Sequence, residues 1–103
     1  MNINYQNRMQ GKTVLVTGSS RGIGFYTAKE LAGMGAQVIV TSHNEEHCQN
    51  AVDKIRASVG EEAARYVVAD LSVQEEVREL AERVKADYKR LDVLVNNVGT
   101  WSS

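Results

Sequence analysis

The residues best suited to chemistry lie near the amino end, where three glycines follow a short apolar run. Residues 17–24 read TGSSRGIG. Gly18 can adopt backbone conformations closed to other residues, so it allows a tight turn. Gly22 leaves room for a pyrophosphate at the start of a helix, and Gly24 lets that helix pack closely. The pattern predicts a dinucleotide-binding loop formed by Gly18, Ser20, Arg21, Gly22, Ile23 and Gly24. The alternative is a glycine-rich turn that binds nothing.

A second polar cluster, Ser42, His43 and Asn44, follows the next apolar run. An acid at the end of this strand would hold the ribose hydroxyls of NAD and repel the 2'-phosphate of NADP. Ser42 stands at that position instead. Arg21 can grip a phosphate through two parallel hydrogen bonds, and Ser42 and His43 can donate to the same phosphate. These residues favour NADP over NAD, although the two glutamates after Asn44 would oppose it. The alternative is that Arg21 and His43 are merely solvated.

Four valine-rich runs predict the strands that position these loops, at residues 13–17, 37–41, 65–69 and 92–96. Their apolar residues are nearly continuous, which is typical of parallel strands buried on both faces. Three helical segments lie between them. The first, 22–34, has an apolar periodicity through Ile23, Tyr26, Thr27, Leu31 and Met34, and Gly35 stops it.

The second and third helices carry clear end signals. Asn44 is the predicted N-cap of a helix that runs to about Val59 and ends at Gly60. Ser72 and Glu75 have capping-box spacing at the start of the third helix. The predicted buried faces are Ala51, Val52, Ile55 and Val59 in the second helix and Val73, Val77, Leu80, Ala81 and Val84 in the third.

This alternation of strands and helices predicts an α/β fold. Right-handed crossovers give a Rossmann-type, three-layer α/β/α domain whose parallel sheet has four strands in the order 3-2-1-4. The ligand crevice should lie where the carboxyl ends of strands 1 and 4 meet. We expect residues 1–10 to form a lead-in and residues 11–103 to form one dinucleotide-binding half domain.

Three motifs together resemble the short-chain dehydrogenase/reductase family. They are the T-G-x-x-x-G-x-G loop, Asp70-Leu71 after the third strand, and Asn96-Asn97-Val98-Gly99 after the fourth. The resemblance covers residues 10–99 and implies that NADP also contacts Asp70, Leu71, Asn97, Val98 and Gly99. Val98 replaces the usual alanine of the family, and its two extra methyl groups could either be tolerated or crowd the nicotinamide ribose. Asn96 and Asn97 could also simply end the strand and hydrogen-bond a neighbouring loop.

The resemblance further implies an oxidoreductase that transfers hydride between NADP(H) and an alcohol or carbonyl substrate. Its Ser-Tyr-Lys catalytic set includes a Y-x-x-x-K pattern, and this sequence has none, so we assign no catalytic residue. We therefore expect a truncated cofactor-binding half that would meet a substrate only together with the missing half. The opening MQGKTVLVTG is similar to that of retinol-dehydrogenase-like members, which implies a lipophilic substrate. The alternatives are a non-enzymatic NADP-binding module and a structural fragment that binds nothing.

The composition narrows the choice of partners and location. The formal net charge of the 103 residues is -1, so we expect no nucleic-acid partner. No apolar run approaches the roughly 20 residues that span a bilayer, and the single Cys48 suits a reducing compartment, so we expect a cytoplasmic protein. His43, His47 and Cys48 match no standard zinc spacing, and we expect no metal site. The fourth strand should be an open sheet edge, which favours self-association.

Overall fold

The computed structural model describes residues 8–20, 22–69 and 74–96, and these residues form alternating strands and helices. In chain order the elements are β1 (Thr13–Val16), α1 (Gly22–Gly33), β2 (Gln37–Ser42), α2 (Glu45–Val59), β3 (Ala64–Val68), α3 (Gln74–Tyr88) and β4 (Val93–Val95). Each element falls within a few residues of its predicted position. None of the described helices is long and apolar enough to cross a membrane.

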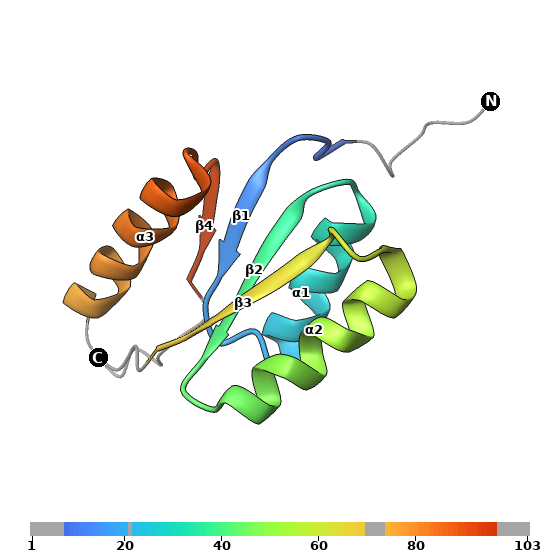
Figure 1. The fold of residues 1–103 in the computed structure, drawn as a ribbon, viewed down its shortest axis with the longest axis horizontal. Coiled ribbons are helices and arrows are strands. Elements are labelled where there is room, and N and C mark those ends of the chain that lie inside the picture. Colours follow the sequence, from blue (N-terminus) through green and yellow to red (C-terminus); the bar gives the residue numbers. More distant parts are fainter. Residues whose placement is uncertain (1–7, 21, 70–73, 97–103) are drawn as a thin grey trace.

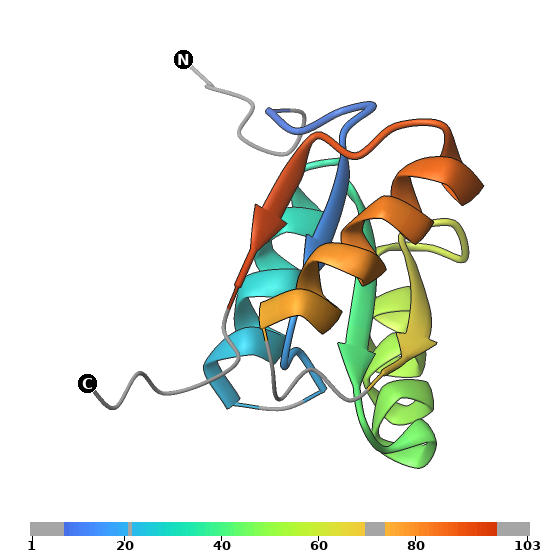
Figure 2. The same cartoon turned by 90° about the vertical axis from the view of Figure 1, so that its left-hand side faces the viewer.

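The strands form one parallel sheet in the order β3-β2-β1-β4. Helices α1 and α2 cover one face of this sheet, and α3 lies against the other (Figure 1). A view turned by 90° looks onto the sheet from the α3 side, with α1 and α2 behind the strands (Figure 2). The predicted three-layer α/β/α fold and its strand order are therefore confirmed.

Alternate residues of the central strands belong to two separate hydrophobic cores, one on each face of the sheet. Val14 and Val16 of β1 pack with α1 and α2, whereas Leu15 between them packs with α3. Val38, Ile39 and Val40 of β2 divide in the same way, and all of these side chains are fully buried. Because both faces of each strand are covered, both sets of side chains must be apolar, which explains the continuous valine-rich runs.

The predicted apolar face of α1 is wrong at Ile23 and Tyr26, whereas Leu31 packs against the core. Ile23 and Tyr26 are 81% and 66% exposed, whereas the buried residues of α1 are Gly24, Ala28 and Ala32. These small residues recur every four positions and so lie on one face of the helix. They allow α1 to lie close to the sheet, whereas a row of large side chains would hold the two layers apart.

The predicted ends of α2 are confirmed. The Asn44 side chain accepts a hydrogen bond of 2.9 Å from the backbone N–H of His47, as an N-cap should. Gly60 follows the last turn with φ 144°, which disfavours residues with a side chain. The core face of α2 contains Cys48, Ala51, Val52 and Ile55, whereas Val59 is 42% exposed, contrary to prediction. Val59 is the last residue of the helix, where coverage by the neighbouring elements ends.

The core face of α3 agrees with its predicted pattern where the structure describes it. Val77, Leu80 and Val84 are buried, and Ala81 packs against them. Val73 and the predicted cap Ser72 lie outside the described residues.

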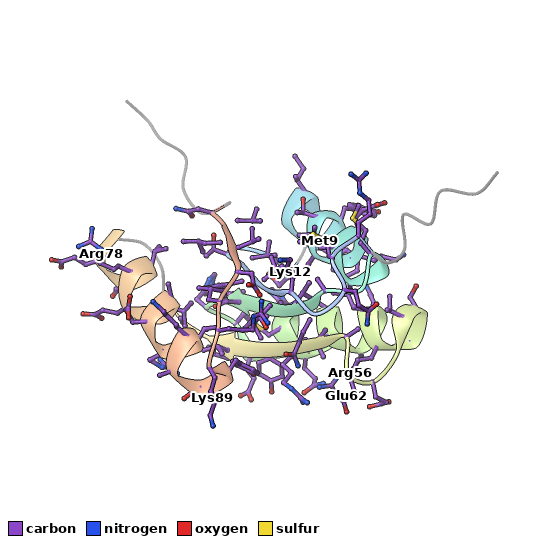
Figure 3. All side chains as sticks on the ribbon, turned by 90° about the horizontal axis from the view of Figure 1, so that it is seen from above. Met9, Lys12, Arg56, Glu62, Arg78 and Lys89 are labelled. Atoms are coloured by element: carbon purple, nitrogen blue, oxygen red, sulfur yellow. The ribbon has the colours of Figure 1, made fainter. Side chains whose placement is uncertain are left out.

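The described part of the predicted lead-in is attached to the domain. The Met9 N–H donates to the carbonyl of Met34 at 2.8 Å, and the Met9 side chain packs against the core. Figure 3 shows Met9 beside α1 and Lys12 nearer the sheet. These contacts close the amino-terminal end of the sheet, opposite the predicted crevice.

Candidate cofactor site at the carboxyl ends of β1, β2 and β4

The glycine loop between β1 and α1 depends on glycine at each of its three positions. Gly18 and Gly22 have φ values of 59° and 66°, in the left-handed region that favours glycine. Gly24 is buried, and a Cβ atom added to it would clash with the carbonyl oxygen of Gly18. A Cβ at Gly22 would meet nothing within 4 Å. The loop is thus folded tightly on one side and open at the start of the helix.

The open start of α1 can receive an anion. The N–H groups of the first turn of any α-helix have no partner within the helix, and the helix dipole makes this end positive. No acidic residue occurs in the first turn of α1. Gly22 and Ile23 are exposed at this end, and Ser20 just before it is half-buried. A phosphate group is therefore a suitable ligand here.

Ser19 attaches the loop to the neighbouring strand, a role that the sequence analysis missed. Its hydroxyl is fully buried, donates to the carbonyl of Val16 and accepts from the N–H of Thr41 at 3.1 Å. The Ser19 N–H in turn donates to the carbonyl of Thr41 at 3.1 Å. The loop is thus tied to the ends of both β1 and β2. In the sequence, a small polar residue directly after Gly18, the first glycine of the loop, is the signal that could have suggested this role.

The ends of β1 and β4 are joined through Thr17 and Asn96. The Thr17 N–H donates to the carbonyl of Val95 at 2.9 Å, and its hydroxyl donates to Oδ1 of Asn96 at 3.0 Å. Asn96 therefore forms a hydrogen bond to the start of the glycine loop. The alternative interpretation of Asn96, as a residue that hydrogen-bonds a neighbouring loop, predicted such a contact. Since the strand order changes direction between β1 and β4, this junction is where ligands bind in open α/β sheets.

The turn between β2 and α2 uses most of its polar atoms internally. The Ser42 hydroxyl accepts from the Asn44 N–H at 3.0 Å, and Oδ1 of Asn44 caps the helix. His43 between them is exposed. An incoming phosphate would therefore meet the His43 ring directly, whereas Ser42 and Asn44 mainly shape the turn.

Behind this turn, Cys48 and Tyr66 have shifted acidities. Burial raises the pKa of the Cys48 thiol, which lies 3.9 Å from the carbonyl oxygen of Ser42. A raised pKa keeps this thiol protonated and unreactive. The Tyr66 hydroxyl donates to Glu45 at 2.9 Å, and this hydrogen bond to a carboxylate raises the pKa of Tyr66.

The structure thus brings together Gly18, Ser20, Gly22, Ile23 and Gly24 in one loop and Ser42, His43 and Asn44 in the next. The remaining predicted cofactor residues lie outside the described residues: Arg21, Asp70, Leu71, Asn97, Val98 and Gly99. No group of metal-binding side chains occurs within residues 8–20, 22–69 and 74–96.

One hollow in the surface lies away from these loops. It has a volume of about 520 Å³ and lies at the amino ends of the strands, between Lys12, Gly35 and Glu62. In parallel α/β sheets, however, ligands bind outside the carboxyl ends of the strands. We therefore place the candidate site at the glycine loop, where the glycines with positive φ and the open helix start coincide.

Comparison with known proteins identifies the family of this chain. The family model for short chain dehydrogenases matches residues 12–103. An uncharacterised oxidoreductase of Schizosaccharomyces pombe is 43% identical over 91 residues, which are 88% of this chain and 27% of that protein. Mouse retinol dehydrogenase 13 is 41% identical over 87 residues, which are 84% of this chain and 26% of the relative.

Comparison with solved structures indicates the same family. A metagenomic short-chain oxidoreductase, solved in complex with NADP, has a TM-score of 0.78 at 38% identity and is matched over 89% of this chain and 41% of its own. The chain thus spans between about a quarter and two fifths of the length of these relatives. The loop geometry, the strand order and the match over residues 12–103 lead to one conclusion. This chain belongs to the short-chain dehydrogenase family.

Proposed function

We propose that this chain is the NADP-binding part of a short-chain dehydrogenase that acts on an alcohol or carbonyl substrate. The observation that carries the proposal is the glycine loop. Gly24 is packed against the Gly18 carbonyl, and the space beside Gly22 is open at the start of α1. This shape fits a pyrophosphate, because a side chain at either position would close the loop or block the approach of the anion.

The residues of the chain would share the binding of the cofactor. The loop from Gly18 to Gly24 would hold the pyrophosphate, with Ser20, Arg21 and Ile23 around it. Asp70 and Leu71 would flank the adenine, and Asn97, Val98 and Gly99 would lie by the nicotinamide ribose. The turn formed by Ser42, His43 and Asn44 would receive the 2'-phosphate chiefly through His43, with Arg21 as its cationic partner. The NADP complex of the similar metagenomic oxidoreductase supports this choice of cofactor.

The bound nicotinamide would supply the hydride chemistry. What this chain contributes is position and charge: the N–H groups of α1 attract the pyrophosphate, and Thr17 and Asn96 keep β1 and β4 together beside it. These 103 residues contain no Y-x-x-x-K, so the groups that move protons to and from the substrate would belong to another part of the protein or to another chain.

Calorimetric titration of the purified chain with NADP, and with NAD in parallel, tests the proposal. We expect NADP to bind more tightly than NAD, because no acid occupies position 42 and a phosphate can be received. Binding of neither nucleotide would contradict the proposal and favour a structural fragment. Tighter binding of NAD would overturn the choice of cofactor.

The substitution R21A tests the contribution of the 2'-phosphate to binding separately from that of the rest of the nucleotide. Loss of a charge-assisted hydrogen bond should weaken NADP about tenfold or more, with a much smaller effect on NAD. R8A, which removes an exposed arginine away from the loop, should change neither affinity. Equal losses for both nucleotides in R21A would contradict the assignment of Arg21 to the 2'-phosphate.

The second candidate is a non-enzymatic NADP-binding module, favoured by the lack of a Y-x-x-x-K pattern in these residues. The two functions differ in turnover. An NADPH oxidation assay with aldehydes and ketones, including lipophilic ones, should give no turnover with this chain alone. Substantial NADPH oxidation by the pure chain would contradict both the second candidate and the proposed division of labour.

The proposal includes a cytoplasmic location, which rests on the lone Cys48. This cysteine is buried and free, as is usual in reducing compartments.

A further inference from the structure

A hydrogen bond joins two elements next to the proposed 2'-phosphate site. Glu45, the first residue of α2, immediately follows the turn formed by Ser42, His43 and Asn44. Its Oε2 accepts a hydrogen bond of 2.9 Å from the hydroxyl of Tyr66, which lies 21 residues further on in β3. The Tyr66 ring also packs against the core that α1 and α2 form with the sheet, and this packing limits the movement of its hydroxyl.

The strand order shows on which side of β2 this hydrogen bond lies relative to the glycine loop. β3 lies on the side of β2 away from β1, and the glycine loop follows β1. A carboxylate held over β3 is therefore drawn away from the loop that would hold the pyrophosphate. Without Tyr66, the Glu45 side chain could turn toward the exposed His43, where its charge would repel a phosphate.

We infer that Tyr66 is a positioning residue for cofactor choice: it holds the Glu45 carboxylate over β3 and so allows the turn after β2 to accept the 2'-phosphate of NADP. This inference rests on the proposed function. It also answers the objection raised by the two glutamates after Asn44, because the first of them is engaged elsewhere. The second, Glu46, is exposed, and no hydrogen bond or ion pair to it is found among the described residues.

The donor is present under ordinary conditions. The hydrogen bond to Glu45 raises the pKa of Tyr66, so its hydroxyl stays protonated through the neutral range and keeps donating. Other charged or titratable groups near this contact are His43, His47, Cys48 and Asp53. No ion pair to Glu45 is found among residues 8–20, 22–69 and 74–96, so Tyr66 is its side-chain partner there.

The substitution Y66F keeps the ring and removes the hydroxyl. A carboxylate released within several ångströms of a phosphate in water should weaken NADP about three- to tenfold, and screening by salt should reduce the effect. NAD carries no 2'-phosphate, so its affinity should not change. E45Q removes the charge, and the double variant Y66F/E45Q should therefore regain the NADP affinity of E45Q alone.

The measurement is calorimetric titration of the wild type and the three variants with NADP and NAD, at low and at physiological salt. A lowered NADP-to-NAD preference in Y66F that Y66F/E45Q restores supports the inference. An unchanged preference in Y66F, or a loss that E45Q does not rescue, overturns it. Wild-type protein that binds NADP no better than NAD overturns the proposed function itself, so the two failures can be told apart.

Discussion

At the scale of single residues, the glycine loop is the feature on which the rest of the site depends. The sequence predicted close packing at Gly24, and the structure specifies the contact as one with the backbone of Gly18. Ser19 adds two hydrogen bonds that fix the same loop to β2. The loop is therefore held by backbone shape and by a buried hydroxyl rather than by large side chains, and this leaves its open side free for a ligand.

A first prediction concerns Gly24. The substitution G24A should lower the free energy of unfolding by about 1–3 kcal/mol, because the new methyl group overlaps the Gly18 carbonyl and the backbone must move. Its matched control is G33A at the other end of α1, where a Cβ meets nothing within 4 Å. G33A should be neutral or stabilising by about 0.5–1 kcal/mol. Urea denaturation compares them, and equal stability of the two variants would contradict the packing described.

A second prediction concerns Thr41 at the end of β2. Its side chain is fully buried, and its Oγ1 has no hydrogen-bond partner within the part of the chain that the structure describes. T41V replaces this hydroxyl with a methyl group and should raise the free energy of unfolding by about 1 kcal/mol, since an unsatisfied buried group is costly. T41S keeps the hydroxyl and removes the methyl group, so it should destabilise. Thermal unfolding of both variants checks this, and a destabilised T41V would indicate a hidden partner.

At the scale of elements, the contacts that join neighbouring strands decide how the site is assembled. Asp92, just before β4, accepts a hydrogen bond of 2.7 Å from the Thr13 N–H of β1 and one of 2.8 Å from Arg90. Its own N–H donates to the carbonyl of Thr13. Asp92 therefore fixes the amino ends of the two strands whose carboxyl ends flank the proposed site.

A third prediction follows from the acidity of Asp92. The Arg90 guanidinium, with help from the Thr13 N–H, holds the pKa of Asp92 below its usual value. A lowered folded-state pKa stabilises the fold above the usual pKa, and this contribution is lost as pH falls through the lowered value. Stability should therefore drop below about pH 4, and D92N should flatten that part of the profile.

The control for this prediction is D87N, which removes an exposed carboxylate from α3. Chemical denaturation between neutral pH and strongly acidic pH should show the wild-type slope in D87N and a smaller one in D92N. An unchanged slope in D92N would mean that the joint between β1 and β4 does not depend on the ionised carboxylate.

At the scale of the whole molecule, the exposed edge of the sheet at β4 is the feature that bears on self-association. The sheet order makes both β3 and β4 edge strands among the described residues. β4 is short, and Leu94 at its centre is 43% exposed although it lies on the face that α3 covers. Unpaired backbone groups and an exposed leucine on one edge favour pairing with another strand.

The fourth prediction is that this chain associates with itself through β4. Sedimentation velocity should show association that increases with concentration, and L94K should reduce it because a charged side chain opposes edge pairing. V68K is the matched control, since Val68 is 41% exposed on the other edge strand. A chain that stays monomeric at high concentration would contradict the prediction. An equal effect of both variants would assign the contact to no particular edge.

Most of the fold could be predicted because its signals are local or nearly so. The alternation of valine-rich runs with helical segments leads to the strand order through general rules of handedness and winding. Asn44 and Gly60 mark the ends of α2 through their own backbone and side-chain chemistry. The buried face of α1 could not be predicted, because it depends on the distance between helix and sheet, which no local pattern records.

By itself, the sequence determined the α/β fold, the order of its strands and the position of the glycine loop, because residue type and spacing encode each of them. The tertiary structure alone decided that Ser19 braces that loop, that Thr17 meets Asn96, and that Tyr66 engages Glu45. Each of these contacts joins residues at least 21 positions apart in the chain. Such pairs meet only after the strands have paired, and their hydrogen bonds depend on angstrom-scale distances that the sequence does not contain.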